Sequence, residues 1–493
     1  MTSLPKQEVF DLRPSDTGPS VERFKLSLFD PIILVVYCHF ALYFKLDNNG
    51  EAKQTTASVL KEGLEKTLGQ ARHLCSTLEQ DVEGGFSFVK TPETTVKYVV
   101  KHLDGPEHPS IDDLEKASFS CRSLGSDLGV WGMDGMLYGE NRPESNPYNS
   151  PITSGFQLNF IRGGAVFSSH IHHWAGDLVG WSNFIRQLAD NCYAISVSRE
   201  TKSLVKWPPW DPACIDVTRF CKDVPKESLV DGPTVAPKHP AHPDEQQTLL
   251  FHLPQSKAGK LKQMAQPSDG SFWASTYDAM CAFVWRCLTR ARVPYYKPAS
   301  LEERAPWFGE SVNMRQRFCN PDPPKRMIRN MLVGGFSELF AEPLPTIGEV
   351  ASLGLGQGTP LSRPASYIRR LTDSVTQSSV EVLLDYISTL KDKQSVSFNL
   401  ASKPPMSLFV TDHRSSDVTD CDFGFSKPIT HRLLMGNCIS PNMVLVYPPP
   451  RSQKTDGSEG VGTIWSITME KGIIHTLLED PEWCEYMEYR GVD

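Results

Sequence analysis

Two adjacent histidines, His172 and His173, are followed by Asp177, four residues after the second. An imidazole with an ordinary pKa of about 6.5 is the usual side chain for taking a proton from a hydroxyl group at neutral pH. Residues 157–167, which precede the pair, are typical of a strand. A strand that ends in this way would present an imidazole base, and the aspartate could anchor the following loop. The pattern predicts general-base chemistry at a hydroxyl group.

The His-x-x-x-Asp spacing is not specific by itself, because it occurs twice more in the chain. His108 and Asp112 share this spacing, as do His413 and Asp417. His108 lies in a polar, turn-rich segment with no apolar strand before it. A surface or capping histidine explains any single match to so short a pattern. The surrounding sequence must therefore decide which match carries chemistry.

The composition of the chain sets broad limits on its fold and partners. With 493 residues the chain is longer than one core usually supports, so two domains are expected. Hydrophobic residues make up 40% and charged residues 22%, as in an ordinary globular protein. The net charge of −8 argues against nucleic acid as a partner, because nucleic-acid binding needs a basic face.

Several features predict a cytoplasmic protein without a membrane span. The first residues contain no apolar signal core. The apolar run 31–44 is shorter than the roughly 20 residues that cross a bilayer, and its β-branched and aromatic content favours buried strands. The twelve cysteines form no Cys-x-x-Cys pair, which indicates reduced thiols. We therefore expect no metal site.

The apolar periodicity places the predicted elements on both sides of a proline-rich crossover at 203–247. Residues 59–68 have the pattern of a helix, and 178–191 have that of an amphipathic helix after the His-x-x-x-Asp segment. The second half opens with a predicted strand at 248–253. These elements divide the chain into an N-terminal domain, 1–215, and a C-terminal domain, 245–493.

Two segments about 250 residues apart, 172–177 and 422–428, resemble the HxxxD and DFGWG signatures of the BAHD acyltransferases. The second reads Asp-Phe-Gly-Phe, a variant similar to the fungal branch typified by trichothecene 3-O-acetyltransferase. Further matches lie in the order of the family and span nearly the whole chain. They are the opening strand at 26–30, the second-domain helix at 275–286, and the segments 312–317 and 329–331.

The sequence also departs from the family pattern at three places. Ser426 stands where the family usually has glycine, and Arg329 stands where glycine precedes Asn330. The segment 410–413 lacks the tryptophan of a Thr-Ser-Trp motif. These departures concern the surfaces for acceptor and CoA rather than the central histidine.

The resemblance implies an α/β fold of two chloramphenicol-acetyltransferase-like domains, with mixed sheets flanked by helices and a channel at their interface. The N-terminal domain would carry HxxxD and the C-terminal domain the DFGF motif. Acyl-CoA would enter the channel from one face and the acceptor from the other. The proline-rich crossover would join the two halves.

The candidate catalytic residues are His173 and Asp177. We expect His173 to act as the general base, with catalysis by a nucleophilic histidine as the alternative. By the family pattern, Asp177 turns away and pairs with Arg315, although it could instead orient the imidazole as in a hydrolase triad. Gly176 is expected to allow the tight turn between them. His172 is expected to pack locally or bond to the backbone.

The resemblance assigns further residues to the remaining roles. Thr411 is the candidate donor to the oxyanion of the tetrahedral intermediate. Asp422 and Gly424 are expected to support the structure away from the chemistry, and Gly424 to supply an unusual backbone angle. The candidate CoA-binding residues are Ser275, Asn330 and Lys427. For Ser275, a plain helix N-cap is an equally good interpretation.

The predicted function is that of an acyl-CoA-dependent O-acyltransferase, most simply an O-acetyltransferase that uses acetyl-CoA and no bound cofactor. Its acceptor would be a hydroxyl of a fungal specialised metabolite, such as an indole or ergot alkaloid, a sesquiterpenoid or a polyketide alcohol. We expect a monomer that binds these two small molecules.

Two other functions remain open. One is an N-acyltransferase or a condensation-type amide-forming enzyme, against which Leu178 argues, because condensation domains usually have glycine there. The other is a non-catalytic binding or regulatory protein on a decayed acyltransferase fold. Such a protein should have lost its base, whereas His173 and Asp177 are both present.

Overall fold

The fold is known from a computed structural model. It describes residues 7–493 except 16–17, 48, 83–84, 137, 139–141, 242–244, 271, 354–358, 436–440 and 452–460.

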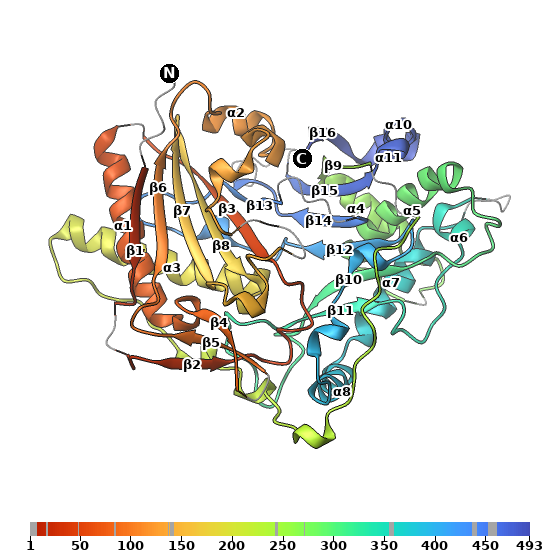
Figure 1. The fold of residues 1–493 in the computed structure, drawn as a ribbon. Coiled ribbons are helices and arrows are strands. Elements are labelled where there is room, and N and C mark those ends of the chain that lie inside the picture. Colours follow the sequence, from red (N-terminus) through yellow and green to blue (C-terminus); the bar gives the residue numbers. More distant parts are fainter. Residues whose placement is uncertain are drawn as a thin grey trace.

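Two large mixed sheets lie side by side in the molecule (Figure 1). The six-stranded sheet has the order β1 (Gln7–Leu12), β6 (Val96–His102), β7 (Ser154–Ile161), β8 (Gly164–His172), β3 (Tyr37–Lys45) and β13 (Thr430–Leu433). The seven-stranded sheet has the order β11 (Leu332–Phe336), β10 (Phe308–Asn313), β12 (Leu408–Asp412), β14 (Met443–Tyr447), β15 (Gly462–Glu470), β9 (Gln246–Pro254) and β16 (Glu488–Val492). Both sheets mix parallel and antiparallel pairs, as the resemblance implied.

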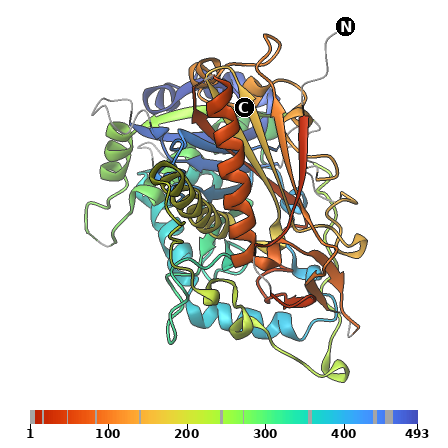
Figure 2. The same cartoon turned by 90° about the vertical axis from the view of Figure 1, so that its left-hand side faces the viewer.

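A small third sheet and several helices complete the first half of the chain. The small sheet is formed by β2 (Glu22–Lys25), β5 (Phe86–Lys90) and β4 (Thr77–Gln80). Helices α1 (Gly50–Gln70) and α3 (Leu178–Thr201) cover one face of the six-stranded sheet, as Figure 2 shows. The short helix α2 (Ile111–Lys116) packs near the end of β3. The predicted helices at 59–68 and 178–191 lie within α1 and α3.

In the second half, α5 (Thr276–Tyr296) is the long helix against the seven-stranded sheet. The other α-helices among the described residues of this half are α4 (Gln255–Met264), α6 (Ile347–Ala351), α7 (Ser362–Ser374), α8 (Gln377–Ser388), α10 (Ile474–Leu478) and α11 (Pro481–Tyr486). The predicted strand at 248–253 lies within β9. No helix among the described residues is both long and apolar enough to cross a membrane.

The two halves share a core where the sheets face each other. Leu250, Leu445, Tyr447 and Ile464 of the seven-stranded sheet belong to the same buried cluster as Phe40 of β3. Strand β13, from the second half of the chain, pairs antiparallel with β3 of the six-stranded sheet. The described residues between α3 and β9 contain only short 3-10 helices and an isolated bridge from Val230 to Leu390. The exact domain boundaries remain a prediction.

The expected opening strand at 26–30 is wrong, because these residues form a turn. The carboxylate of Asp30 accepts a hydrogen bond from the backbone of Ser27 at 2.7 Å, and the Ser27 hydroxyl accepts one from Phe29 at 3.2 Å. Such local side-chain bonds compete with a strand ladder. The apolar run that follows becomes a strand only at Tyr37.

Candidate active site

The two histidines lie where β8 ends and a 3-10 turn, His173–Ala175, begins. His172 is the last residue of β8 and pairs with Tyr37 of β3. The backbone N–H of His173 donates to the carbonyl of Val36 at 2.8 Å. Pairing with β3 therefore fixes the backbone of His173 although the strand has ended.

Both ring nitrogens of His172 have hydrogen-bond partners within the protein. Its Nε2 lies 2.9 Å from the carbonyl oxygen of Ser145, and its Nδ1 accepts a hydrogen bond from the backbone N–H of Trp174 at 3.2 Å. The side chain is completely buried, and burial lowers the pKa of His172 to about 4. His172 is therefore a neutral structural residue, as predicted.

His173 has a different environment from its neighbour. Its side chain is half-buried, and its Nδ1 is buried with no hydrogen-bond partner among the described residues. Burial lowers the pKa of His173, while backbone groups of His173 and Gly176 and the charge of Asp177 oppose the shift. The imidazole is therefore neutral at neutral pH, the form that can accept a proton. Since Nδ1 is buried, Nε2 is the ring nitrogen left for a substrate.

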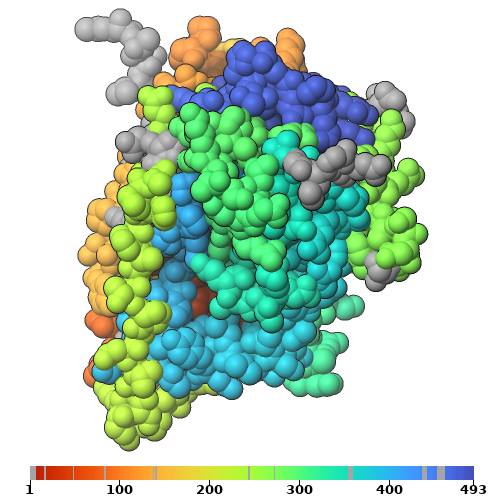
Figure 3. Space-filling view, turned by 90° about the vertical axis from the view of Figure 1, so that its right-hand side faces the viewer, coloured from red at the N-terminus to blue at the C-terminus, as the bar shows by residue number. Residues whose placement is uncertain are grey.

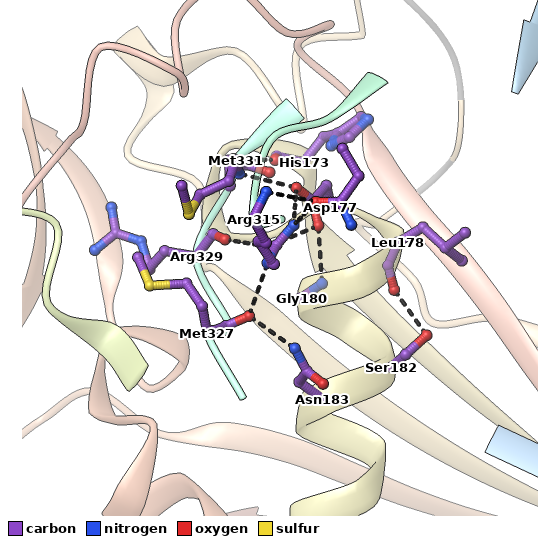
Figure 4. A network of polar contacts seen from close by, with 12 residues as sticks. His173, Asp177, Leu178, Gly180, Ser182, Asn183, Arg315, Met327, Arg329 and Met331 are labelled. Carbon is purple, nitrogen blue, oxygen red and sulfur yellow. Dashed lines mark hydrogen bonds and ion pairs between the residues drawn. The ribbon is translucent and has the colours of Figure 1, made fainter. Parts of the chain in front are cut away.

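Asp177 is bound by Arg315, which confirms the predicted ion pair. Nη1 of Arg315 lies 3.0 Å from Oδ2 of Asp177, and Nη2 lies 3.0 Å from Oδ1. Oδ1 also accepts from the N–H of Gly180 at 2.8 Å and thereby caps α3, and Oδ2 accepts from Met331 at 2.9 Å. Figure 4 shows the His173 ring pointing away from this network. The carboxylate therefore secures the loop and is not the partner of the imidazole.

Arg315 ties this loop to the second half of the chain. It follows β10 by two residues, and its side chain also donates to the Asn313 side chain at 3.2 Å and to the backbone carbonyls of Met327, at 3.3 Å, and Arg329 (Figure 4). The side chains of Arg315 and Asp177 are 7% and 2% exposed. A buried pair of this kind must satisfy its donors and acceptors in full, and these contacts do so.

The glycines after the histidines allow a close approach of the second half of the chain. A Cβ on Gly176 would lie 3.0 Å from the carbonyl oxygen of Ile328, and a Cβ on Gly180 would lie only 1.9 Å from it. The φ angle of Gly176 is −179°, an extended conformation that any residue adopts. The expected tight turn is therefore not the reason for Gly176. The steric requirement is stricter at Gly180, which sequence reasoning missed.

Asn330 requires a correction to its expected CoA contact. Its side chain is fully buried and donates to Oδ1 of Asp30 at 2.9 Å and to the carbonyls of His173, at 2.9 Å, and Trp174, at 3.0 Å. The amide group therefore has its partners within the protein, where it holds the backbone at His173 and Trp174. The segment 329–331 gave no sign of this in the sequence, since its asparagine could as well face a ligand.

Thr411 lies on β12 with its side chain toward the first half of the chain. It pairs with Leu445 of the neighbouring strand β14, and Leu445 belongs to the core shared by the two halves. Paired residues of neighbouring strands point to the same face of a sheet. The side chain is half-buried, and no described residue makes a hydrogen bond to its hydroxyl. The oxyanion role of Thr411 remains a prediction that this orientation favours.

The other two His-x-x-x-Asp matches lie in different environments. His413 is buried against His431, with ring centroids 5.9 Å apart, and burial lowers the pKa of His413 to about 4. His108 lies 3.8 Å from a carboxylate oxygen of its neighbour Glu107. His413 directly follows β12 (Leu408–Asp412) as His173 follows β8, so its burial and not its position separates the two, whereas His108 directly follows no strand.

The loop that carries the DFGF motif lies far from His173. The Ser426 hydroxyl donates to the carbonyl of Lys45 at 3.0 Å, and Lys45 ends β3 at the opposite end from Tyr37. Eight residue steps along a strand are roughly 25 Å. Gly424 has a φ of +80°, and a Cβ there would lie 2.4 Å from the Ser196 hydroxyl, so both conformation and space require glycine.

The polar residues around this loop and at the start of α5 have local partners. Oδ1 of Asp422 accepts from the N–H of Gly424 at 2.9 Å, and its other oxygen lies 3.7 Å from the amine of Lys427. Ser275 caps α5 by accepting from Asp278 at 3.1 Å, and the Asp278 carboxylate accepts from the Ser275 N–H at 2.7 Å. The N-cap interpretation of Ser275 is confirmed. Contacts of Ser275 and Lys427 with CoA remain predictions.

One cluster of potential metal ligands occurs among the described residues, formed by Cys287, Asp480 and Glu482. Its centre already holds the guanidinium of Arg290. Arg290 lies 2.7 Å from Asp480, 2.7 Å from Glu482 and 3.5 Å from the sulfur of Cys287. The acidic groups are therefore neutralised by an arginine, and this donor set does not fit a metal ion.

Neither His173 nor Asp177 lines either of two surface cavities. One, of about 670 Å³, is bordered by Lys45, Asn49 and Phe425; the other, of about 340 Å³, by Trp207 and Trp210. Figure 3 shows a hollow in the face of the second half, with dark red atoms of the first part of the chain at its base. The tunnel between the two halves remains a prediction.

Comparisons with known proteins find related sequences over most of the chain. Residues 151–471 match the family described as "Transferase family", and residues 36–192 match the trichothecene 3-O-acetyltransferase-like N-terminal domain. An acetyltransferase of Gibberella zeae is 43% identical over 99% of this chain and 95% of its own length. A trichothecene 3-O-acetyltransferase of Fusarium sporotrichioides is 25% identical over 94% of this chain and 95% of its own.

Solved structures show the same fold at lower identity. TRI101 of F. graminearum, complexed with coenzyme A and deoxynivalenol, superposes with a TM-score of 0.73 at 20% identity, over 95% of this chain and 100% of that one. Vinorine synthase gives a TM-score of 0.64 at 17% identity, over 99% of this chain and 100% of that one. The predicted two-domain α/β fold is therefore confirmed.

Proposed function

The chain belongs to the Transferase family, that of the BAHD acyltransferases, and on this premise we propose that it is an acetyl-CoA-dependent O-acetyltransferase of a small hydroxylated metabolite. The full-length relative at 43% identity is an acetyltransferase, and two more distant relatives are O-acetyltransferases. That the chain is an acyltransferase follows from the family. The acetyl donor, the acceptor and the catalytic residues are the proposal.

The observation that carries the proposal is the separation of His173 from Asp177. The neutral imidazole keeps Nε2 for a substrate, whereas the carboxylate is fully bound by Arg315 and backbone N–H groups. This arrangement differs from a hydrolase triad, in which the carboxylate orients the histidine that activates a serine. A lone neutral histidine suits direct general-base catalysis.

The proposed reaction has two steps, addition to the thioester and collapse of the intermediate. His173 takes the proton of the acceptor hydroxyl as the oxygen attacks the thioester carbonyl and forms a tetrahedral oxyanion. Thr411 would donate its hydroxyl hydrogen to that oxyanion. When the intermediate collapses, the carbon–sulfur bond breaks, the ester forms, and the imidazolium returns the proton to the CoA thiolate. A thioester is already activated, so positioning and one proton transfer are the main demands.

The names of the relatives favour particular acceptors. The relatives include enzymes named for trichothecenes and for eremophilanes. We propose a sesquiterpenoid, an indole or ergot alkaloid, or a polyketide alcohol as the acceptor of this chain. TRI101 was solved with coenzyme A, which supports CoA as the carrier of the acyl group here. Ser275 and Lys427 are the proposed contacts for it.

The test is thiol release from acetyl-CoA in the presence of hydroxylated metabolites, with the ester product identified by mass. The proposal expects release that depends on an alcohol acceptor and a product heavier by one acetyl group. Matched amines in place of the alcohols test the N-acyltransferase alternative. Release with amines alone would overturn the proposal, and no release with any acceptor would favour a non-catalytic binding protein.

A further inference from the structure

We infer that Asp30, Arg329 and Asn330 form a clamp between the two halves of the chain and act as positioning residues for His173. This inference rests on the proposed function, since it assigns these residues a role in general-base catalysis. The clamp is separate from the Asp177–Arg315 pair and holds the other side of the same loop. It contains the arginine that departs from the family pattern.

The contact with the catalytic loop comes from Asn330. Its amide donates to the carbonyls of His173, at 2.9 Å, and Trp174, at 3.0 Å. These are the first two carbonyls after β8. The N–H of His173 is still held by Val36 of the neighbouring segment, whereas its carbonyl and that of Trp174 are held by the amide of Asn330. Asn330 therefore helps to set the direction of the peptide planes after His173, on which the position of the imidazole depends.

Asp30 fixes the orientation of that amide. Its Oδ1 accepts from Asn330 at 2.9 Å, and its Oδ2 accepts from Arg329 at 3.0 Å and from the Ser27 N–H at 2.7 Å. Asp30, Arg329 and Asn330 are each completely buried. An asparagine amide can flip by half a turn, but only one orientation gives its N–H groups to Asp30 and the two carbonyls.

Arg329 supplies the counter-charge to the buried carboxyl of Asp30. Its guanidinium lies over the ring of Phe88, 5.0 Å from the centroid, and donates to the carbonyl of Lys25 at 3.1 Å. Burial raises the pKa of Asp30, and the charge of Arg329 opposes that rise. With glycine at this position, as the family pattern has it, the carboxylate would lack this counter-charge.

The segment 329–331 joins the clamp to the Asp177–Arg315 pair. Arg315 donates to the backbone carbonyl of Arg329, and the N–H of Met331 donates to Asp177 at 2.9 Å, while the side chains of residues 329 and 330 face Asp30. Figure 4 shows the Arg329 side chain directed away from Arg315. One short segment therefore fixes both ends of the loop, through its backbone at one end and its side chains at the other.

The test is a double-mutant cycle on Asp30 and Arg329. We expect Asp30→Asn and Arg329→Met each to lower kcat on the order of tenfold or more, because small misplacements of a reacting group are costly. KM for acetyl-CoA should stay within about threefold, since the clamp does not bind substrate. The double variant leaves neither the Asp30 carboxyl nor the Arg329 guanidinium buried without its partner, so its kcat should be higher than that of at least one single variant. Arg329→Lys, which keeps the charge, should retain most of the activity.

Asn330→Ala provides a readout that does not need the reaction. We expect faster hydrogen exchange in this variant at the backbone amides of residues 172–178. The control is Asp231→Asn, which removes one partner of the exposed ion pair with Lys391 and should leave the exchange of these amides unchanged. The exchange result stands even if the wild-type chain proves to transfer no acetyl group. The inference is overturned if exchange at this loop is unchanged, if the cycle is additive, or if kcat per folded enzyme equals that of the wild type.

Discussion

The carboxylate of Asp177 is held by the guanidinium of Arg315 through two contacts of 3.0 Å, one to each oxygen. Arg315 follows β10 in the second half of the chain, and Asp177 caps α3 in the first. The pair therefore joins the two halves at the point where the proposed base lies. None of the hydrogen bonds that the described residues make to Asp177 comes from the His173 ring.

Replacing Arg315 by alanine tests this structural role. The change would leave the Asp177 carboxylate buried without its counter-charge, at an expected cost of about 3–5 kcal/mol in the free energy of unfolding. Urea unfolding of the variant measures that cost. Arg370→Ala, which breaks the more exposed pair with Glu342, should cost no more than about 1 kcal/mol. An Arg315→Ala protein as stable as the wild type would show that the pair is dispensable.

The close packing at Gly180 predicts a second effect on stability. A Cβ there would lie 1.9 Å from the carbonyl oxygen of Ile328, so Gly180→Ala must displace α3 or the segment before Arg329, at a cost of about 1–3 kcal/mol. Gly259 on α4 is the matched control, because a Cβ there meets nothing within 4 Å. Gly259→Ala should stabilise by about 0.5–1 kcal/mol. Equal effects of the two changes would contradict the proposed close contact.

Sequence reasoning could predict the Asp177–Arg315 pair, because it follows from a motif with a known arrangement. It could also predict the structural role of His172, because successive side chains diverge near a strand end. It could not predict the clamp. An arginine at a glycine position gives no sign that Asp30, 299 residues away, will be its buried partner. Asn330 was predicted to contact CoA for a similar reason, since its acceptors are the distant Asp30 and two backbone carbonyls that no residue type reveals.

Two parts of the fold could not be predicted from the apolar pattern of the sequence. Residues 26–30 look like a strand in apolar content, yet hydrogen bonds of Asp30 and Ser27 close them into a turn. Strand β13 has four residues and pairs with β3 rather than with a neighbour in the second half. So short a strand contains too little pattern to specify its partner.

The dependence of the rate on pH should reflect the buried position of His173. Burial lowers the pKa of His173, and the base acts in its neutral form, so kcat/KM falls only as pH drops through this lowered pKa. The acid limb should therefore have its midpoint below the ordinary histidine value of about 6.5. Rates of ester formation, measured by product mass from about pH 4.5 to about pH 9, locate this midpoint, because histidines titrate within about this range. A midpoint clearly above the ordinary value would exclude this environment for the base.

The order of the chemical steps predicts the form of the two-substrate kinetics. Direct transfer needs acetyl-CoA and the acceptor bound together, with the reacting atoms within about 3–3.5 Å. Double-reciprocal plots at several fixed acceptor concentrations should then give intersecting lines. Parallel lines would mean an acetyl-enzyme intermediate and would make His173 a nucleophile.

The central claim is that His173, and not His172, is the base, and replacing each by alanine tests it most directly. For His173→Ala we predict a fall in kcat of at least about 10²-fold, with the affinity for acetyl-CoA, measured by calorimetry, unchanged. His172→Ala should weaken stability through its lost bonds to Ser145 and Trp174 but retain a measurable rate in the folded fraction. A His173→Ala enzyme with near-native kcat, beside an inactive but folded His172→Ala enzyme, would contradict the account.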